Sequence, residues 1–284
     1  MKREFQYPSR DGVTQIHAIE WEPEGEIHAV MQLCHGMVEF IDRYDAFAKY
    51  LNEHGIYVVG HDHLGHGKSV QNEEYHGYFH KTNGNEYVIG DIHKLREMTQ
   101  KKYPDKPYFM LGHSMGSFLI RQYMEMYGSG LSGVIVMGTG AQPGVALFFG
   151  KLLCKVIAAF KGDDYRSAFV DNMAFGGYNK RFEPARTDKD WLMKKRWTPI
   201  WQIRGVHSAL QSMHIIICSV ALSMHRKKRI LKRFQKICRC IWWQDQTILL
   251  ETSEKVWKML QKRIGNVELK MCHLSSMRKT VMRY

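Results

Sequence analysis

The stretch around Ser114 has the residue types and spacing of a serine nucleophile. Residues 108–120 read YFMLGHSMGSFLI, in which Gly112 and Gly116 flank the serine. An apolar run precedes this Gly-x-Ser-x-Gly motif and a helical pattern follows it, so we expect Ser114 on a sharp turn between a strand and a helix. Glycines suit such a turn because larger side chains would clash with the neighbouring strand and helix. The alternative is a chance occurrence of the motif in a loop.

Two backbone N–H groups are candidates for an oxyanion hole beside this serine. A helix that starts at Ser114 points its free N–H groups toward the reacting centre, which makes the N–H of Met115 one donor. The loop after an earlier apolar run contains His35-Gly36-Met37. The N–H of Met37 is the second predicted donor, because this loop is expected to face Ser114 across the top of the sheet.

Residues 60–69, GHDHLGHGKS, contain four side chains of the types that bind metals: His61, Asp62, His63 and His66. A metal site needs side chains that converge from an ordered frame. The glycines inside this stretch instead indicate a turn at the end of a strand. We therefore interpret it as a structural turn at the carboxyl edge of the sheet, and we predict neither a metal nor a cofactor.

Short apolar runs alternate with helical patterns over the first part of the chain. Strands are expected at residues 13–21, 28–36, 55–62, 107–112 and 133–138. Two helical faces are expected, one formed by Tyr44, Phe47, Ala48 and Leu51 and the other by Val88, Ile92, Leu95 and Met98. This alternation predicts an α/β fold in which a mostly parallel sheet carries helices on both faces.

The pattern changes after Gly138. Residues 144–160 are an apolar helix candidate, whereas residues 171–192 read as irregular and rich in glycine and aromatic residues. We interpret this region as a lid inserted above the sheet. The predicted domains are an N-terminal core at residues 1–138, a lid or cap at 139–195, and the C-terminal part of the core at 196–284.

Charge is distributed unevenly along the 284 residues, whose net charge is +13. The segment from Lys194 to the end holds 20 Lys and Arg against 4 Asp and Glu, which is +16, and the preceding residues therefore carry −3. A slightly acidic body does not favour nucleic acid as a partner. The basic end is compatible with a nucleic-acid arm, a basic membrane segment, or a tail that was never selected as protein.

Neither a membrane span nor a disulfide framework is expected. The longest apolar run, HIIICSVAL, is shorter than the roughly 20 residues that a transmembrane helix needs, and the opening residues MKREFQYPSRDG do not lead into an apolar segment. We therefore expect a cytoplasmic protein. The cysteines lack CxxC spacing and are interpreted as reduced thiols, at Cys34, Cys154, Cys218, Cys238, Cys240 and Cys272.

These residues resemble a known family. The stretches CHGMVEFIDRYDAFAKYLNEHGIYVVGHDHLGHGKS (34–69) and YFMLGHSMGSFLIRQYM (108–124) are similar to the lysophospholipase and monoacylglycerol lipase branch of the α/β-hydrolases, also described as serine aminopeptidase S33-like. The likeness covers about residues 5–193. It implies the α/β-hydrolase fold with an inserted lid. It also implies that Ser114 cleaves carboxylic esters of single-chain lipids, monoacylglycerols or lysophospholipids, through an acyl-enzyme.

The resemblance has further implications for the site and its partners. It assigns the oxyanion hole to the N–H groups of Met37 and Met115, and it implies a small lipid ester as the substrate without a nucleic-acid partner. A transient contact of the lid with a membrane surface is compatible with it, and no oligomeric state is predicted. Apolar lid residues would cover an acyl-chain pocket, although core packing explains each one equally well: Val145, Leu147, Phe148, Leu152, Leu153, Val156 and Ile157.

The family pattern stops after the lid. Members of the family carry the triad acid on a turn resembling SGxxDPVG and the base in a later Arg-His-Glu context, and neither occurs in this sequence. The nearest substitutes are Asp245 as the acid and His273 as the base. One alternative is therefore a non-catalytic, inactive remnant of such a hydrolase. Another is an S33-like peptidase or a thioesterase, because the motif determines the nucleophile and not the leaving group.

A displaced reading frame explains the departure. Read one nucleotide out of register, the codons of WTPIWQIRGVHSAL (197–210) permit Val-Asp-Thr-Tyr-Met-Ala-Asp-Pro, a normal sequel to the lid in this family. Those of DQTILLETSEKV (245–256) permit Ser-Asp-Asp-Pro-Val-Gly, the turn that carries the acid. We therefore expect about residues 195–260 to be out of frame and to pack poorly. A divergent C-terminal half or a genuine basic arm are the other interpretations.

Overall fold

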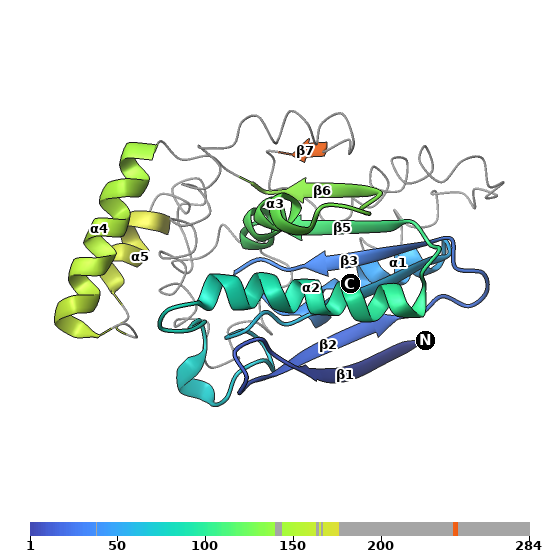
Figure 1. The fold of residues 1–284 in the computed structure, drawn as a ribbon, viewed down its shortest axis with the longest axis horizontal. Helices are drawn as coiled ribbons and strands as arrows, with labels where there is room; N and C mark the ends of the chain where they lie inside the picture. The colour runs from blue at the N-terminus through green and yellow to red at the C-terminus, as the bar shows by residue number, and fades with distance from the viewer. Residues whose placement is uncertain (38, 140–143, 163–164, 166, 176–240, 244–284) are drawn as a thin grey trace, which may run out of the picture. The chain divides into compact units, whose positions relative to one another are not determined.

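Seven strands form one sheet in the order β1-β2-β4-β3-β5-β6-β7 (Figure 1). The structure, a computed structural model, describes residues 1–37, 39–139, 144–162, 165, 167–175 and 241–243. β2 pairs antiparallel with both β1 and β4, and the remaining pairs are parallel, which confirms the predicted mostly parallel sheet. The strands are β1 (Lys2–Pro8), β2 (Gln15–Trp21), β3 (Ala29–Cys34), β4 (Ile56–His61), β5 (Tyr108–His113), β6 (Gly133–Met137) and β7 (Ile241–Trp243).

Two strands differ from what the sequence pattern predicts. β1 was not expected, because as an edge strand it exposes most of its residues and lacks an apolar run. β2 was expected from a period-two alternation, yet every residue from Ile16 to Trp21 is buried. The polar residues of β2 are accommodated by bonds: the His17 ring contacts the Asp62 carboxylate, and the Glu20 carboxylate accepts from the Tyr57 hydroxyl.

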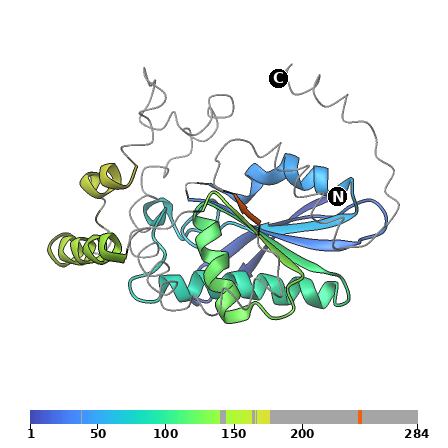
Figure 2. The same ribbon diagram turned by 90° about the horizontal axis from the view of Figure 1, so that it is seen from above.

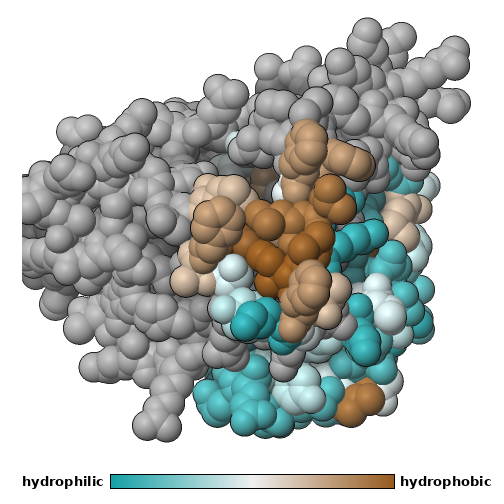
Figure 3. All heavy atoms as spheres, turned by 90° about the vertical axis from the view of Figure 1, so that its left-hand side faces the viewer, coloured by the Kyte–Doolittle hydropathy of each residue, from teal (hydrophilic) through white to brown (hydrophobic). Residues whose placement is uncertain are grey.

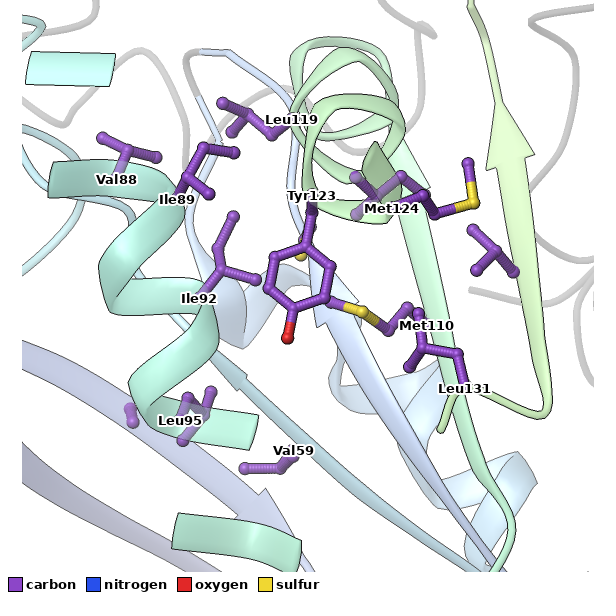
Figure 4. Packing of buried hydrophobic residues seen from close by; sticks show 14 of the residues in the cluster. Val59, Val88, Ile89, Ile92, Leu95, Met110, Leu119, Tyr123, Met124 and Leu131 are labelled. Carbon is purple, nitrogen blue, oxygen red and sulfur yellow. The ribbon is translucent and has the colours of Figure 1, made fainter. Parts of the chain in front are cut away.

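Helices cover both faces of the sheet, as predicted. In Figure 2, α1 (Asp45–Asn52) lies on one face, and α2 (Gly84–Lys102) and α3 (Met115–Tyr127) lie on the other. The short 3-10 helices are η1 (Ile41–Tyr44), just before α1, and η2 (Glu73–Tyr75). The predicted apolar faces are buried with one exception, because Met98 is 39% exposed. Apolar side chains from α2 and α3 interlock with the sheet, among them Val88, Ile92, Leu95, Leu119 and Tyr123 (Figure 4).

The region predicted as a lid contains two described helices. α4 (Gly144–Lys161) agrees with the apolar helix expected there, but α5 (Ala168–Phe175) shows that the expectation of irregular structure was wrong for residues 171–175. Apolar side chains gather on the surface of α4 (Figure 3), and the exposed ones include Phe148, Phe149, Leu152, Val156 and Phe160. Within the described ranges, no helix is long and apolar enough to cross a bilayer.

Most of the predicted C-terminal part, residues 196–284, lies outside the described residues. The exception is β7, which extends the sheet by parallel pairing with β6. The expected poor packing of residues 196–260 stays a prediction, as do the two boundaries between the three predicted domains.

Candidate active site

The turn at Ser114 joins β5 to α3 in a conformation that serine rarely adopts. Its φ is 50° and its ψ is −115°, and it is the one non-glycine residue with positive φ among those the structure describes. Such a conformation persists only where the surroundings hold it. Two contacts do so here: the Ser114 N–H donates to the Met137 carbonyl at 2.9 Å, and the Ser117 N–H donates to the Ser114 carbonyl at 2.9 Å.

Both glycines of the motif are required by close backbone contacts. A Cβ at Gly112 would stand 2.4 Å from the Gly116 carbonyl oxygen. A Cβ at Gly116 would stand 2.1 Å from the carbonyl oxygen of Cys34, the last residue of β3. The steric reason for Gly-x-Ser-x-Gly therefore holds at both positions, and the second contact seats the end of β3 directly against the turn.

The predicted oxyanion loop begins at that same point. The His35 ring is buried, and its Nδ1 lies 2.6 Å from the Gly36 carbonyl oxygen while its Nε2 accepts from the His63 N–H at 3.0 Å. A carbonyl can only accept, so the proton is on Nδ1. The Gly36 carbonyl and the Met37 N–H belong to one planar peptide group. His35 therefore orients the N–H that the sequence predicts as an oxyanion donor.

Two histidines of the 60–69 turn, His61 and His63, are linked by hydrogen bonds to β1 and to α2. The Tyr7 hydroxyl donates to the Asp91 carbonyl at 3.0 Å, so it must accept from His61 Nδ1 at 2.9 Å. His61 Nε2 is then an acceptor for His63 Nδ1, 3.0 Å away. The hydrogen bonds therefore all run in one direction: His63 donates to His61, His61 donates to Tyr7, and Tyr7 donates to the Asp91 carbonyl. Both imidazole rings in this series are neutral.

Burial lowers the pKa values of these imidazoles because the charged form loses its hydration. The pKa falls to about 3 for His61 and for His66, and the charge that His35 would carry opposes protonation of both. The pKa values of His35 and His63 are lowered by burial as well. The part of the chain that the structure describes contains no cluster of three or more potential metal ligands.

Two acidic residues that sequence reasoning did not assign connect the loops of the site. Asp62 accepts from the N–H groups of Ile41 and Lys68, at 2.7 and 2.9 Å. Glu39 accepts from the Gly36 N–H at 2.8 Å and from His113 Nδ1 at 3.2 Å. The sequence signal that could have identified Glu39 is its position three residues after Gly36 in the predicted oxyanion loop.

Of the remaining predicted site residues, Met115 lies within the described structure. It is the first residue of α3, directly after Ser114, and its role as an oxyanion donor stays a prediction. His273 and Asp245 lie outside the described residues, so the base and the acid stay predictions. Among the residues that the structure describes, no side chain is hydrogen-bonded to the Ser114 hydroxyl.

The family described as "Serine aminopeptidase, S33" matches residues 25–210. The chain is 35% identical over 114 residues to a monoglyceride lipase of Mus musculus, covering 39% of this chain and 36% of that protein. It also resembles a thermostable carboxyl esterase from Bacillus coagulans in complex with glycerol, with 32% identity and a TM-score of 0.61, covering 67% of this chain and 61% of the esterase.

A second solved structure, a lipase in its open form, has 25% identity and a TM-score of 0.65, covering 78% of this chain and 74% of the lipase. The chain spans about a third of the length of the curated relatives it matches. The family match includes β3 to β6 and the Ser114 turn. The fold is that of the α/β-hydrolases.

Proposed function

Because the chain belongs to the serine aminopeptidase S33 family, we propose that its described half carries the nucleophile and oxyanion hole of a serine hydrolase for carboxylic esters of single-chain lipids. The observation that carries this proposal is the Ser114 turn, with its positive φ of 50° at the start of α3 and with the end of β3 packed against Gly116. This is the arrangement that exposes a serine hydroxyl beside the N-terminus of a helix.

The proposed reaction has two steps. Ser114 Oγ attacks the ester carbonyl carbon while a histidine takes its proton, and the N–H groups of Met37 and Met115 stabilise the oxyanion. Collapse expels the alcohol, which receives that proton, and leaves an acyl-enzyme. Water then attacks the acyl group, releasing a fatty acid and restoring the serine. His273 is the nearest candidate for the base, and Asp245 for the acid that orients it.

Two observations favour a lipid ester. The similar mouse protein is named a monoglyceride lipase, and the similar Bacillus enzyme is a carboxyl esterase. In addition, α4 exposes large apolar side chains, including Phe148, Leu152 and Val156. These would line an acyl-chain pocket, and they would also suit a transient contact with a membrane surface.

The missing sequence context of the acid and base favours a second candidate, a non-catalytic remnant. A fluorophosphonate probe separates the two, because it labels only an activated serine: a working hydrolase is labelled in the full chain but not in Ser114→Ala, whereas a remnant is labelled in neither. Hydrolysis of monoacylglycerol, lysophospholipid and an aminoacyl amide then identifies the substrate class. Labelling equal in both proteins would refute Ser114 as the nucleophile, and preferred cleavage of the amide would assign a peptidase instead.

A further inference from the structure

Glu39 is a buried carboxylate that joins the oxyanion loop to the nucleophile turn. Its Oε2 accepts from the Gly36 N–H at 2.8 Å, from the Tyr44 hydroxyl at 2.9 Å and from His113 Nδ1 at 3.2 Å. Its Oε1 pairs with the Arg43 guanidinium. The Glu39 side chain is 4% exposed and His113 immediately precedes the nucleophile, so one carboxylate contacts both halves of the proposed oxyanion site.

The charge of Glu39 is required by these contacts. Burial raises the pKa of its carboxyl, but the interactions with His113 and Arg43 and the hydrogen bond from Gly36 outweigh burial and hold the pKa well below its usual range. Glu39 is therefore an acceptor at both oxygens. All four of its partners are donors, which an amide of the same shape cannot match because its nitrogen also donates.

We propose that Glu39 is a positioning residue that fixes the Gly36–Met37 segment and the Ser114 turn relative to each other, and thereby orients both oxyanion donors. This role rests on the proposed function. It follows from how Gly36 is held: Glu39 binds its N–H, and His35 binds its carbonyl at 2.6 Å. The two peptide groups that flank the Gly36 Cα are both fixed, so the Met37 N–H has one direction.

The identity of residue 36 supports the same inference. Glycine is the residue with the greatest backbone freedom, so a catalytic N–H that follows it needs external restraint. A Cβ at Gly36 would stand 3.1 Å from Glu39 Oε2 and 3.2 Å from His113 Nδ1. The Glu39 carboxylate and the His113 ring therefore both pack closely against Gly36.

The test compares three full-length proteins: the unmodified chain, the Glu39→Gln variant, and the Asp91→Asn variant as a matched control. Asp91 is also a buried carboxylate, but it binds the Ser9 hydroxyl and the Arg10 N–H, away from the turn. Hydrogen exchange by mass spectrometry reports on peptides spanning 34–40 and 112–117. We expect exchange of both peptides to rise about tenfold or more in Glu39→Gln and to stay at the original rate in Asp91→Asn.

The second measurement is the rate of fluorophosphonate labelling of Ser114. In Glu39→Gln the limiting rate should fall about tenfold or more while the half-saturating probe concentration is unchanged, since donor orientation and not probe binding is affected. Unchanged exchange in both peptides would overturn the proposal, as would equal slowing of labelling by the two variants.

Two further outcomes keep the test decisive. Should the Gln variant fail to fold, Glu39→Asp replaces it, because it keeps the charge but is one methylene shorter and should give a smaller rise confined to the same peptides. Should the unmodified chain resist labelling, as the displaced frame of its base and acid predicts, the hydrolase function fails for the chain as written, and the exchange rates alone decide whether Glu39 restrains the two segments.

Discussion

The carbonyl oxygen of Cys34, at the end of β3, lies against the Cα of Gly116 in the first turn of α3, with no room between them for a methyl group. Both atoms belong to the backbone of packed elements, so neither can rotate away as a side chain would. This contact sets how closely the predicted oxyanion loop approaches the Ser114 turn.

The first prediction follows from that contact. Gly116→Ala should lower the free energy of unfolding by about 1–3 kcal/mol, because overpacking forces backbone to shift. Gly90→Ala in α2 is the control. Its Cβ would meet the Arg10 side chain at 2.8 Å, which can move, and alanine favours a helix. Urea unfolding of both variants checks this; equal losses would contradict the steric argument.

A second prediction concerns the hydrogen-bond chain that ends at Asp91. Tyr7→Phe removes one hydroxyl and leaves a buried His61 N–H without its acceptor, so it should destabilise the fold by about 1–3 kcal/mol. Tyr103→Phe is the comparison, because that hydroxyl bonds Glu22 at 3.1 Å in a partly exposed setting. Thermal unfolding should rank Tyr7→Phe as clearly the less stable variant. A reversed ranking would show that the hydrogen bonds from His61 through Tyr7 to Asp91 do not stabilise the fold.

The buried histidines predict acid sensitivity. The unfolded chain binds protons near pH 6.5, whereas folded His61 and His66 resist them until about pH 3. Their contribution to stability is therefore complete above pH 6.5 and is lost as the pH falls toward 3. Each such histidine contributes a slope of about 1 kcal/mol per pH unit. His35 and His63 act in the same direction.

Two buried groups oppose this trend. Burial raises the pKa of Asp91 to about 6, so its contribution is present at low pH and lost as the pH rises through 6. Burial lowers the pKa of His17, but its hydrogen bonds to the Asp62 and Glu4 carboxylates outweigh burial and raise it, so its contribution is also lost as the pH rises. These two groups do not offset four imidazoles. Urea unfolding at pH 7.5 and 5 should therefore show lower stability at pH 5, and His66→Gln should reduce the difference. Equal stability at the two pH values would contradict the buried, neutral state of the cluster.

The last prediction concerns turnover by the chain as written. A serine without its base and acid loses on the order of 10⁴-fold or more in rate, retaining only oxyanion and binding contributions. We expect little hydrolysis of a short-chain ester by the literal chain. A version with the reading frame restored after residue 195 should be active, and its activity should depend on Ser114. Comparable Ser114-dependent turnover by both proteins would refute the displaced-frame interpretation.

The parts of the fold that the sequence predicts are those determined by local sterics and periodicity. The Ser114 turn was predictable because Gly-x-Ser-x-Gly permits a backbone conformation that most neighbours would forbid. The strands β3, β4, β5 and β6 were predictable because buried parallel strands are short and apolar on both faces. The exposure of Met98 was not predictable, because helical periodicity does not indicate how far along the helix the core extends.

The polar framework of the site could be found only in three dimensions. Glu39 meets His113 across 74 positions of the chain, and Tyr7 meets Asp91 across 84. No local pattern records which buried donor a carboxylate or hydroxyl will face, because the partner is chosen by the packing of distant strands. The sequence alone therefore determined the class of fold, and it predicts Ser114 as the nucleophile. The tertiary structure decided how the oxyanion loop is held, since hydrogen bonds between distant segments exist only once the sheet has formed.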